Sequence, residues 1–319
     1  MSAEYLPDPA QQKWLLTHLA ELIRHRGRKT FLQGKLVEPT DAFFPDKWTA
    51  DSKGIERLVR RVMKYAAMAD FGVDLELFTE GKIPLFDMHG KVYGQMHAGD
   101  VAAWFSSLDG AVCHFGVDTN NLEDPGALAA ILCHEVAHAW RARYGMEYET
   151  RAEDEPLTDL TTVYLGFGIL TTNLSYAYRA TQSSYSHRRG GYLPPEAMSF
   201  ALAAQVVARG DEPALAKRVR GFLETNQAAF FDAAREHLAS QEIGVLLGLE
   251  KSRRTEGFVR RVRKRRFLIV REVCSDCDAD LPSAATECPK CLAPIEGSED
   301  RRAAPTVDVE DILKKLKKD

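Results

Sequence analysis

The stretch ILCHEVAHAW, residues 131–140, places two histidines four positions apart inside a run that is otherwise almost wholly apolar. Residues four apart on an α-helix lie on the same side, one turn from each other, so His134 and His138 can reach one metal ion. Glu135 flanks that side, where a base acting on a metal-activated water would stand. The alternative is a core helix whose histidines find ordinary hydrogen-bond partners. Such an apolar run is normally buried, and burying two imidazoles and a carboxylate is costly unless they share a task, which favours the metal site.

The motif lies within a segment that reads as one helix, DPGALAAILCHEVAHAWRARYG, residues 124–145. Asp124 is its expected N-cap, Pro125 stands in its first turn, and Gly145 marks its end. The next helix is expected to begin at EPLTDL and to cover residues 156–178. Further helical patterns occupy 194–210 and 211–240. The sequence therefore predicts a helical core at 124–250.

The chain before residue 124 mixes helical and strand patterns. Apolar positions at helical spacing predict an amphipathic helix over 10–26 and a second helix over 54–71. Short apolar pieces at 73–80, 91–99 and 110–119, separated by Gly and Asp turns, predict strands. We therefore expect an α+β fold that is mostly helical, with an N-terminal α+β region at 1–123.

Composition limits the classes of partner. The chain has 319 residues, 28% of them charged, and a net charge of −4, so it has no overall field that suits a nucleic-acid backbone. Residues 157–178 are long enough to cross a membrane, but their threonines, tyrosines and Asn173 favour a buried core helix. The N-terminal residues lack a basic stretch followed by an apolar core, so we expect no signal peptide, no membrane partner and a cytoplasmic location.

A catalytic zinc takes three protein ligands and keeps one position for water, so a third ligand is needed. Downstream, within RAEDEPLTDL, Glu155 and Asp159 are again four positions apart, and Glu155 follows His138 by 17 positions. Pro156 comes directly after Glu155 and would place it at a helix boundary. Two neighbouring carboxylates therefore remain alternatives for the third ligand, namely Glu153 and Asp154.

HEVAH at 134–138 followed by EPLTD at 155–159 resembles the gluzincin metallopeptidases, the thermolysin-like superfamily, over roughly residues 111–180. The resemblance implies a catalytic zinc held by His134, His138 and Glu155, with Glu135 as general base and Asp159 orienting a ligand histidine. It also implies that an edge strand before the metal helix holds the substrate backbone. Residues 110–122 are the candidate for that strand, and a plain core strand is the alternative reading.

Peptide hydrolysis also needs a hydrogen-bond donor for the oxyanion that forms when water attacks the carbonyl. Four side chains stand in suitable stretches, and the sequence does not choose among them: Tyr144, Tyr148, His187 and Tyr192. A residue of these types in such a stretch is more often an ordinary packed or surface residue.

Four cysteines form two Cys-x-x-Cys pairs near the C-terminal end of the sequence: Cys274 with Cys277, and Cys288 with Cys291. Two such pairs close a tetrahedral shell, so the spacing predicts a structural zinc and resembles a small zinc ribbon at 271–295. A basic connector at 251–270 precedes it, and a flexible linker with a short helix at 296–319 follows. Residues 251–295 are candidates for docking nucleic acid or protein, although a charged run is also typical of a solvated face.

Two interpretations of the function therefore fit the sequence. The first is a zinc metallopeptidase, with one catalytic and one structural zinc, acting on a peptide or protein substrate. The second is a non-catalytic or regulatory binding protein that uses the zinc ribbon and the basic segment. Glu135 discriminates between them, because hydrolysis requires its carboxylate whereas a purely structural site tolerates glutamine.

Overall fold

The computed structural model describes residues 5–78, 82–86, 92–97, 102–175, 177–180, 185–188, 191–249, 258–264, 267–273 and 288. The chain divides into two compact units, Met1–Ile23 with Thr30–Leu249, and Arg24–Lys29 with Glu250–Asp319. The composition of the sequence changes near residue 250, and a unit boundary lies there. The predicted regions 1–123 and 124–250 both belong to the first unit, except for Arg24–Lys29 and residue 250. The described residues are mostly helical and include a small three-stranded sheet, so the expected α+β class is confirmed.

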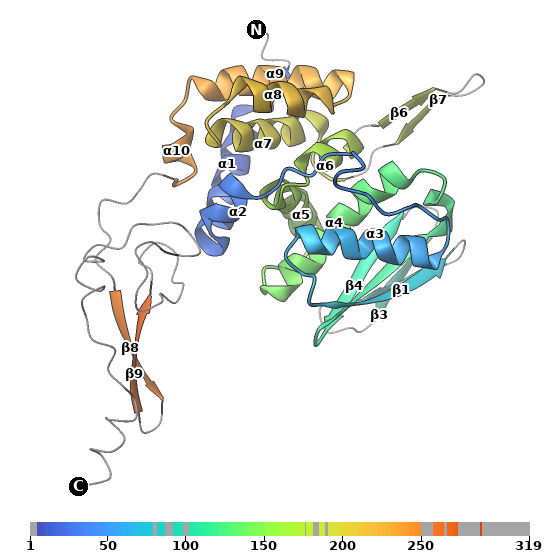
Figure 1. Cartoon of the computed structure of the whole chain (residues 1–319), viewed down its shortest axis with the longest axis horizontal. Coiled ribbons are helices and arrows are strands. Elements are labelled where there is room, and N and C mark those ends of the chain that lie inside the picture. The colour runs from blue at the N-terminus through green and yellow to red at the C-terminus, as the bar shows by residue number, and fades with distance from the viewer. Residues whose placement is uncertain are drawn as a thin grey trace. The chain divides into compact units, whose positions relative to one another are not determined.

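The secondary-structure elements follow one another along the chain as in Figure 1. The helices are α1 Pro9–Arg26, α2 Arg28–Gln33, α3 Ser52–Tyr65, η3 Thr119–Asn121, α4 Pro125–Arg143, α5 Arg151–Leu165, α6 Gly168–Leu174, α7 Pro195–Ala208, α8 Pro213–Gly221, α9 Thr225–Ala239 and α10 Ile243–Leu246. The strands are β1 Gly72–Phe78, β2 Lys82–Phe86, β3 Val92–His97, β4 Ala103–Asp109, β5 Val112–Asp118, β6 Ala177–Ala180, β7 Tyr185–Arg188, β8 Phe258–Lys264 and β9 Phe267–Val273.

The three-stranded sheet has the order β1-β5-β4. β5 pairs in parallel with β1 and antiparallel with β4, and the register of β4 shifts between Phe105 and Ser107. The strand expected at an edge, within 110–122, is therefore the central strand of this sheet, and that expectation is wrong. Within the described part of the chain β1 and β4 are the edge strands of this sheet, and β4 lies against α4. Strand order depends on pairing between distant segments, which local sequence patterns do not reveal.

Helix α4 forms where the sequence predicts it. The Asp124 carboxylate accepts a hydrogen bond from the Ala127 N–H at 3.0 Å, and Pro125 occupies the first turn, so both expected N-terminal signals operate. Arg141 and Arg143 lie in the last turn, where positive charge interacts favourably with the helix dipole and stabilises the helix. Most residues between Leu128 and Arg141 are buried, because α3, α5, α6 and β4 all pack against this helix. Polar side chains within that span are therefore held in a largely dry environment.

The single helix expected over 156–178 is wrong at both ends. α5 begins at Arg151, so Pro156 lies inside the helix rather than at its boundary. Pro156 is the sixth residue of α5, so it removes one N–H that would otherwise face the Ala152 carbonyl, yet the helix continues through it. The helix ends at Leu165, because the next residue, Gly166, has a left-handed φ of 91°. Helix α6 then begins at Gly168. None of the helices in the described ranges is both long and apolar enough to cross a membrane.

Replacing Gly166 with alanine should destabilise the first unit. A left-handed alanine costs about 1–2 kcal/mol, and a Cβ at Gly166 would lie 2.0 Å from the Lys35 carbonyl oxygen, adding about 1–3 kcal/mol of steric strain. Gly145 is the matched control, because its φ is 60° and a Cβ there meets nothing within 4 Å. Urea unfolding of both alanine variants measures the difference, and equal losses would show that the Lys35 contact is unimportant.

Candidate metal centre

Two histidines of α4 and one glutamate of α5 converge on one point. The Nε2 atoms of His134 and His138 are 3.2 Å apart, and Glu155 Oε2 lies 3.0 Å from the first and 3.1 Å from the second. His134 and Glu155 are buried, with exposed fractions of 8% and 4%, and His138 is partly buried. The structure thus brings together the three residues that the sequence suggests as ligands, and they form a group that can hold a metal ion.

The partner of each outer ring nitrogen defines the tautomer. His134 Nδ1 lies 2.8 Å from Asp159 Oδ1, and a carboxylate only accepts, so Nδ1 carries the proton. His138 Nδ1 lies 3.2 Å from Thr158 Oγ1, whose own proton goes to the Asp154 carbonyl, so this Nδ1 also donates. In their neutral forms both imidazoles would therefore carry the proton on Nδ1 and direct an Nε2 lone pair toward Glu155 Oε2.

Three lone pairs facing one another within hydrogen-bond distance repel unless protons or a metal ion lie among them. Bonds of about 2.0–2.1 Å to one tetrahedral ion would separate the ligand atoms by roughly 3.3 Å, close to the three separations observed. The two nitrogens and one oxygen also suit zinc and similar transition metals. The donor set therefore fits the metal that the sequence motif suggests.

The same atoms bind protons when no metal competes for them. Burial disfavours the imidazolium of His134, but hydrogen bonds to Asp159 and Glu155 outweigh it and raise its pKa well above the ordinary value. Burial also opposes ionisation of Glu155, but the two histidines overcome it and hold the pKa of its carboxyl far below the usual range. Metal binding at this group is therefore expected to release protons and to weaken as the pH falls.

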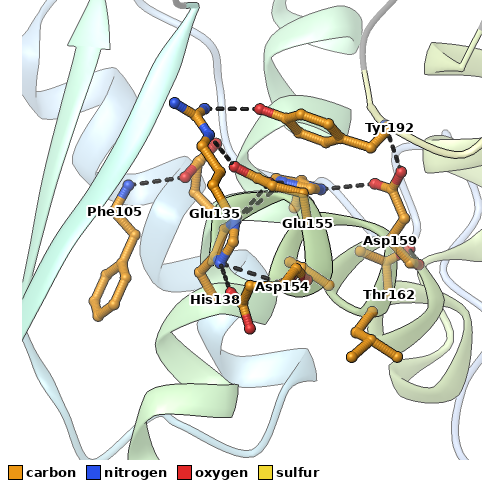
Figure 2. Close-up of polar contacts among 12 residues, drawn as sticks. Phe105, Glu135, His138, Asp154, Glu155, Asp159, Thr162 and Tyr192 are labelled. Carbon is orange, nitrogen blue, oxygen red and sulfur yellow. Dashed lines mark hydrogen bonds and ion pairs between the residues drawn. The ribbon is translucent and has the colours of Figure 1, made fainter. Parts of the chain in front are cut away.

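Glu135 is buried beside the three converging residues but points to a different partner. Its Oε2 accepts a hydrogen bond from the Phe105 N–H of β4 at 2.8 Å, so the edge strand fixes this carboxylate (Figure 2). Burial raises the pKa of Glu135, and the nearby His134 and His138 offset part of that effect. The carboxylate thus lies next to the group of His134, His138 and Glu155 rather than within it.

The two alternative ligands have other partners. Glu153 is exposed and accepts a hydrogen bond from Thr150 Oγ1 at 2.5 Å. Asp154 accepts from Arg141 Nη2 at 2.8 Å and from the Tyr148 N–H at 3.0 Å, and its Oδ2 lies 3.3 Å from His138 Nδ1. Asp154 therefore orients His138 from outside, as Asp159 orients His134, which local spacing did not indicate.

The candidates for an oxyanion donor separate by position. Tyr192 stacks against His134, with ring centroids 6.0 Å apart and planes 26° apart. Tyr144 packs edge-on against Trp140, and Tyr148 is 50% exposed. The side chain of His187 lies outside the described residues. Tyr192 is therefore the described candidate whose ring lies against a ligand histidine.

Arg151 is a site residue that the sequence interpretation missed. Its Nε donates to Glu155 Oε1 at 2.5 Å, and its Nη2 donates to the Tyr192 hydroxyl at 2.7 Å. The available signal was the four-residue spacing from Arg151 to Glu155 on one helix, which is typical of an ion pair. The contact with Tyr192 had no such signal, because it joins residues 41 positions apart.

The expected zinc ribbon is mostly beyond what the structure describes. Cys274, Cys277 and Cys291 lie outside the described residues, and Cys288 is buried. The backbone of the preceding basic segment forms the antiparallel pair β8–β9, which aligns Phe258 with Val273. The second zinc and the nucleic-acid or protein partner for residues 251–295 therefore stay predictions.

Changing Asp159 to asparagine should weaken metal binding about 10–100-fold. Asp159 Oδ1 contacts His134 while Oδ2 accepts the N–H groups of Tyr192 and Leu193 at 2.6 and 2.8 Å. An amide can accept on one side only, so one of these contacts must break. Competition with a chromophoric chelator measures the affinity. Glu153→Gln is the control on the same helix, and an equal effect in both variants would contradict this role for Asp159.

No family model matches the chain, and comparison with curated proteins and with solved structures finds no match.

Proposed function

We propose that the protein is a zinc-dependent peptidase of the gluzincin type, with His134, His138 and Glu155 as zinc ligands and Glu135 as general base. The observation that carries this proposal is the convergence of three possible ligand atoms at 3.0–3.2 Å beside a buried carboxylate that is held by an edge strand. Each part answers a requirement of metal-assisted hydrolysis: three ligands, a base and a surface for the substrate.

Zinc bound by these residues would supply a Lewis acid that activates water at neutral pH. Two histidines and one carboxylate also serve non-haem iron, so the ligand set alone does not choose the reaction. Glu135 favours hydrolysis, because attack by water needs a group that takes up a proton and later gives it to the leaving amine. Its raised pKa, caused by burial, strengthens it as a base relative to an exposed carboxylate.

The strand β4 is the proposed support for the peptide backbone. It stands at one edge of the described three-stranded sheet, and it reaches the site through the Phe105 N–H that binds Glu135. An extended peptide can add to such an edge by main-chain hydrogen bonds. The β-bulge beside Phe105 turns the strand locally, as bulges near active sites commonly do. The role that the gluzincin resemblance gave to 110–122 thus passes to residues 103–109.

Tyr192 is the proposed donor to the oxyanion. Its hydroxyl accepts a hydrogen bond from Arg151 and also interacts with the Glu155 carboxylate, so its proton would turn from Glu155 toward an oxyanion as negative charge develops there. Burial is the largest cause that raises the pKa of Tyr192 above its ordinary range, so the hydroxyl stays protonated at neutral pH. A neutral donor held by Arg151 next to a ligand histidine suits stabilisation of developing negative charge.

The test is cleavage of a mixed-sequence peptide library by the full-length, zinc-loaded protein, with products identified by mass spectrometry. We expect a defined set of cleaved bonds that disappears with a chelator and returns when zinc is added back. A protein that demonstrably holds zinc at His134, His138 and Glu155 but cleaves no peptide would contradict the proposal and would favour the binding-protein alternative.

A further inference from the structure

The second oxygen of Glu155 has a partner of its own. Oε2 faces the two histidines, whereas Oε1 accepts a hydrogen bond from Arg151 Nε at 2.5 Å. Arg151 stands one helical turn before Glu155 on α5, and its side chain is about half exposed while that of Glu155 is 6% exposed. A carboxylate held in this way presents one oxygen to a metal and keeps the other turned toward the arginine.

The same guanidinium continues to Tyr192. Its Nη2 donates to the phenolic oxygen at 2.7 Å, and its central carbon lies 5.8 Å from the centre of the tyrosine ring. The ring of Tyr192 in turn stacks on His134. One side chain thus joins the carboxylate ligand to an aromatic residue that covers a histidine ligand, although 37 positions separate Glu155 from Tyr192 in the sequence.

A second connection runs through the backbone of Tyr192 and Leu193. Both N–H groups donate to Asp159 Oδ2, and Figure 2 shows Tyr192 beside Asp159. The other oxygen of that carboxylate holds His134. Gly191 has a φ of 93°, and a Cβ there would come within 3.2 Å of Asp159 Oδ2, so glycine permits this close approach. The segment 191–193 is therefore tied to two ligands by separate routes.

We propose that Arg151 is a positioning residue that keeps Glu155 a one-oxygen ligand and couples the metal centre to Tyr192, so that metal binding and the placement of segment 191–193 stabilise each other. This inference rests on the proposed metal site and assigns Arg151 a role in it. Linkage requires reciprocity: whatever strengthens the Tyr192 contact strengthens metal binding, and a bound metal holds Tyr192 over the site.

Arginine is the residue type that this coupling needs. Its planar guanidinium donates from two nitrogens in fixed directions, here toward a carboxylate and a phenol. Lysine carries a comparable charge on a single nitrogen and cannot reproduce both contacts in the same geometry. The variants Arg151→Ala and Arg151→Lys therefore separate the effect of charge from the effect of the two-sided contact.

The test measures the zinc affinity of the full-length protein by competition with a chromophoric chelator. The Glu155→Ala protein supplies the baseline, because it retains any zinc held at the four cysteines. We expect Arg151→Ala to weaken binding about 10–100-fold and Tyr192→Phe to weaken it less. In the Arg151→Ala or Arg151→Lys background, Tyr192→Phe should have a clearly smaller effect than in the unmodified chain, because only the direct contact of its hydroxyl with Glu155 is left to lose. Arg60→Ala is the control, because Arg60 forms an equivalent four-residue pair with Glu56 on α3.

Two results would overturn the coupling while leaving the metal site intact: an Arg151→Ala protein that binds zinc as tightly as the unmodified chain, or effects of Arg151→Ala and Tyr192→Phe that simply add. A variant that merely weakens α5 would give such additive effects, so the double-variant comparison distinguishes positioning from general destabilisation. If the unmodified chain binds no more zinc than Glu155→Ala, the metal site itself is wrong and the coupling fails with it.

Discussion

Glu135→Gln should lower the rate of peptide hydrolysis about 10²–10⁴-fold while the zinc content stays unchanged. Glutamine has nearly the same shape and keeps an oxygen that accepts the Phe105 N–H, so the contact between α4 and β4 is preserved. It cannot take up a proton, and the general-base step is lost. The rate is measured on a peptide that the unmodified protein cleaves, with metal content determined on the same samples.

The control for this variant is Glu147→Gln, which changes an exposed glutamate between α4 and α5. It removes one negative charge near the site without touching the ligands. We expect its rate to match the unmodified protein. Comparable losses in the two variants would show that Glu135 acts through the general field of the site rather than as a proton acceptor.

Arg141→Met should destabilise the first unit by about 3–5 kcal/mol. Arg141 is 2% exposed and donates to Asp154 Oδ1 at 2.8 Å, to the Met146 carbonyl at 2.6 Å and to Thr161 Oγ1 at 3.4 Å. Its removal leaves the Asp154 carboxylate largely buried without its cationic partner. Because Asp154 also contacts His138, zinc affinity should fall together with the urea midpoint.

Two further variants test the reason for that loss. Arg143→Met, two residues along α4, removes a partly exposed arginine 3.9 Å from Asp70 and should cost no more than about 1 kcal/mol. Adding Asp154→Leu to Arg141→Met removes the stranded charge and should recover part of the stability. If Arg141→Met and Arg143→Met shift the urea midpoint equally, the buried pair does not support the site as described.

The ligand group was predictable because its geometry is local. The spacing of His134 and His138 fixes their common helix face, and Asp124 and Pro125 fix where that helix begins. Glu155 lies on the next helix, 17 positions beyond His138, and its choice over Glu153 and Asp154 came from the gluzincin resemblance. The histidine pair and the start of its helix, by contrast, follow from periods and caps that the sequence states directly.

Other features depend on contacts between distant segments. Gly166 follows the last residue of α5, at a point where the backbone comes close to Lys35. The Gly166 carbonyl oxygen accepts a hydrogen bond from the Val37 N–H at 2.8 Å. The apolar run 157–178 indicated neither contact. The parallel pairing of β1 with β5 likewise joins residues 40 positions apart, and the hydrogen bond from Phe105 to Glu135 joins residues 30 positions apart. Propensity and periodicity describe each segment by itself, so they could not identify β4 as the edge strand that lies against α4.

The most direct test of the metal centre is the zinc content of the full-length protein compared with its Glu155→Ala variant, each dialysed against the same zinc buffer. The account predicts that the unmodified protein holds about one equivalent more zinc than the variant, since Glu155 is one of three ligands in a single site. Equal zinc content in two folded proteins would contradict it and would make HEVAH a core helix with conventionally bonded histidines.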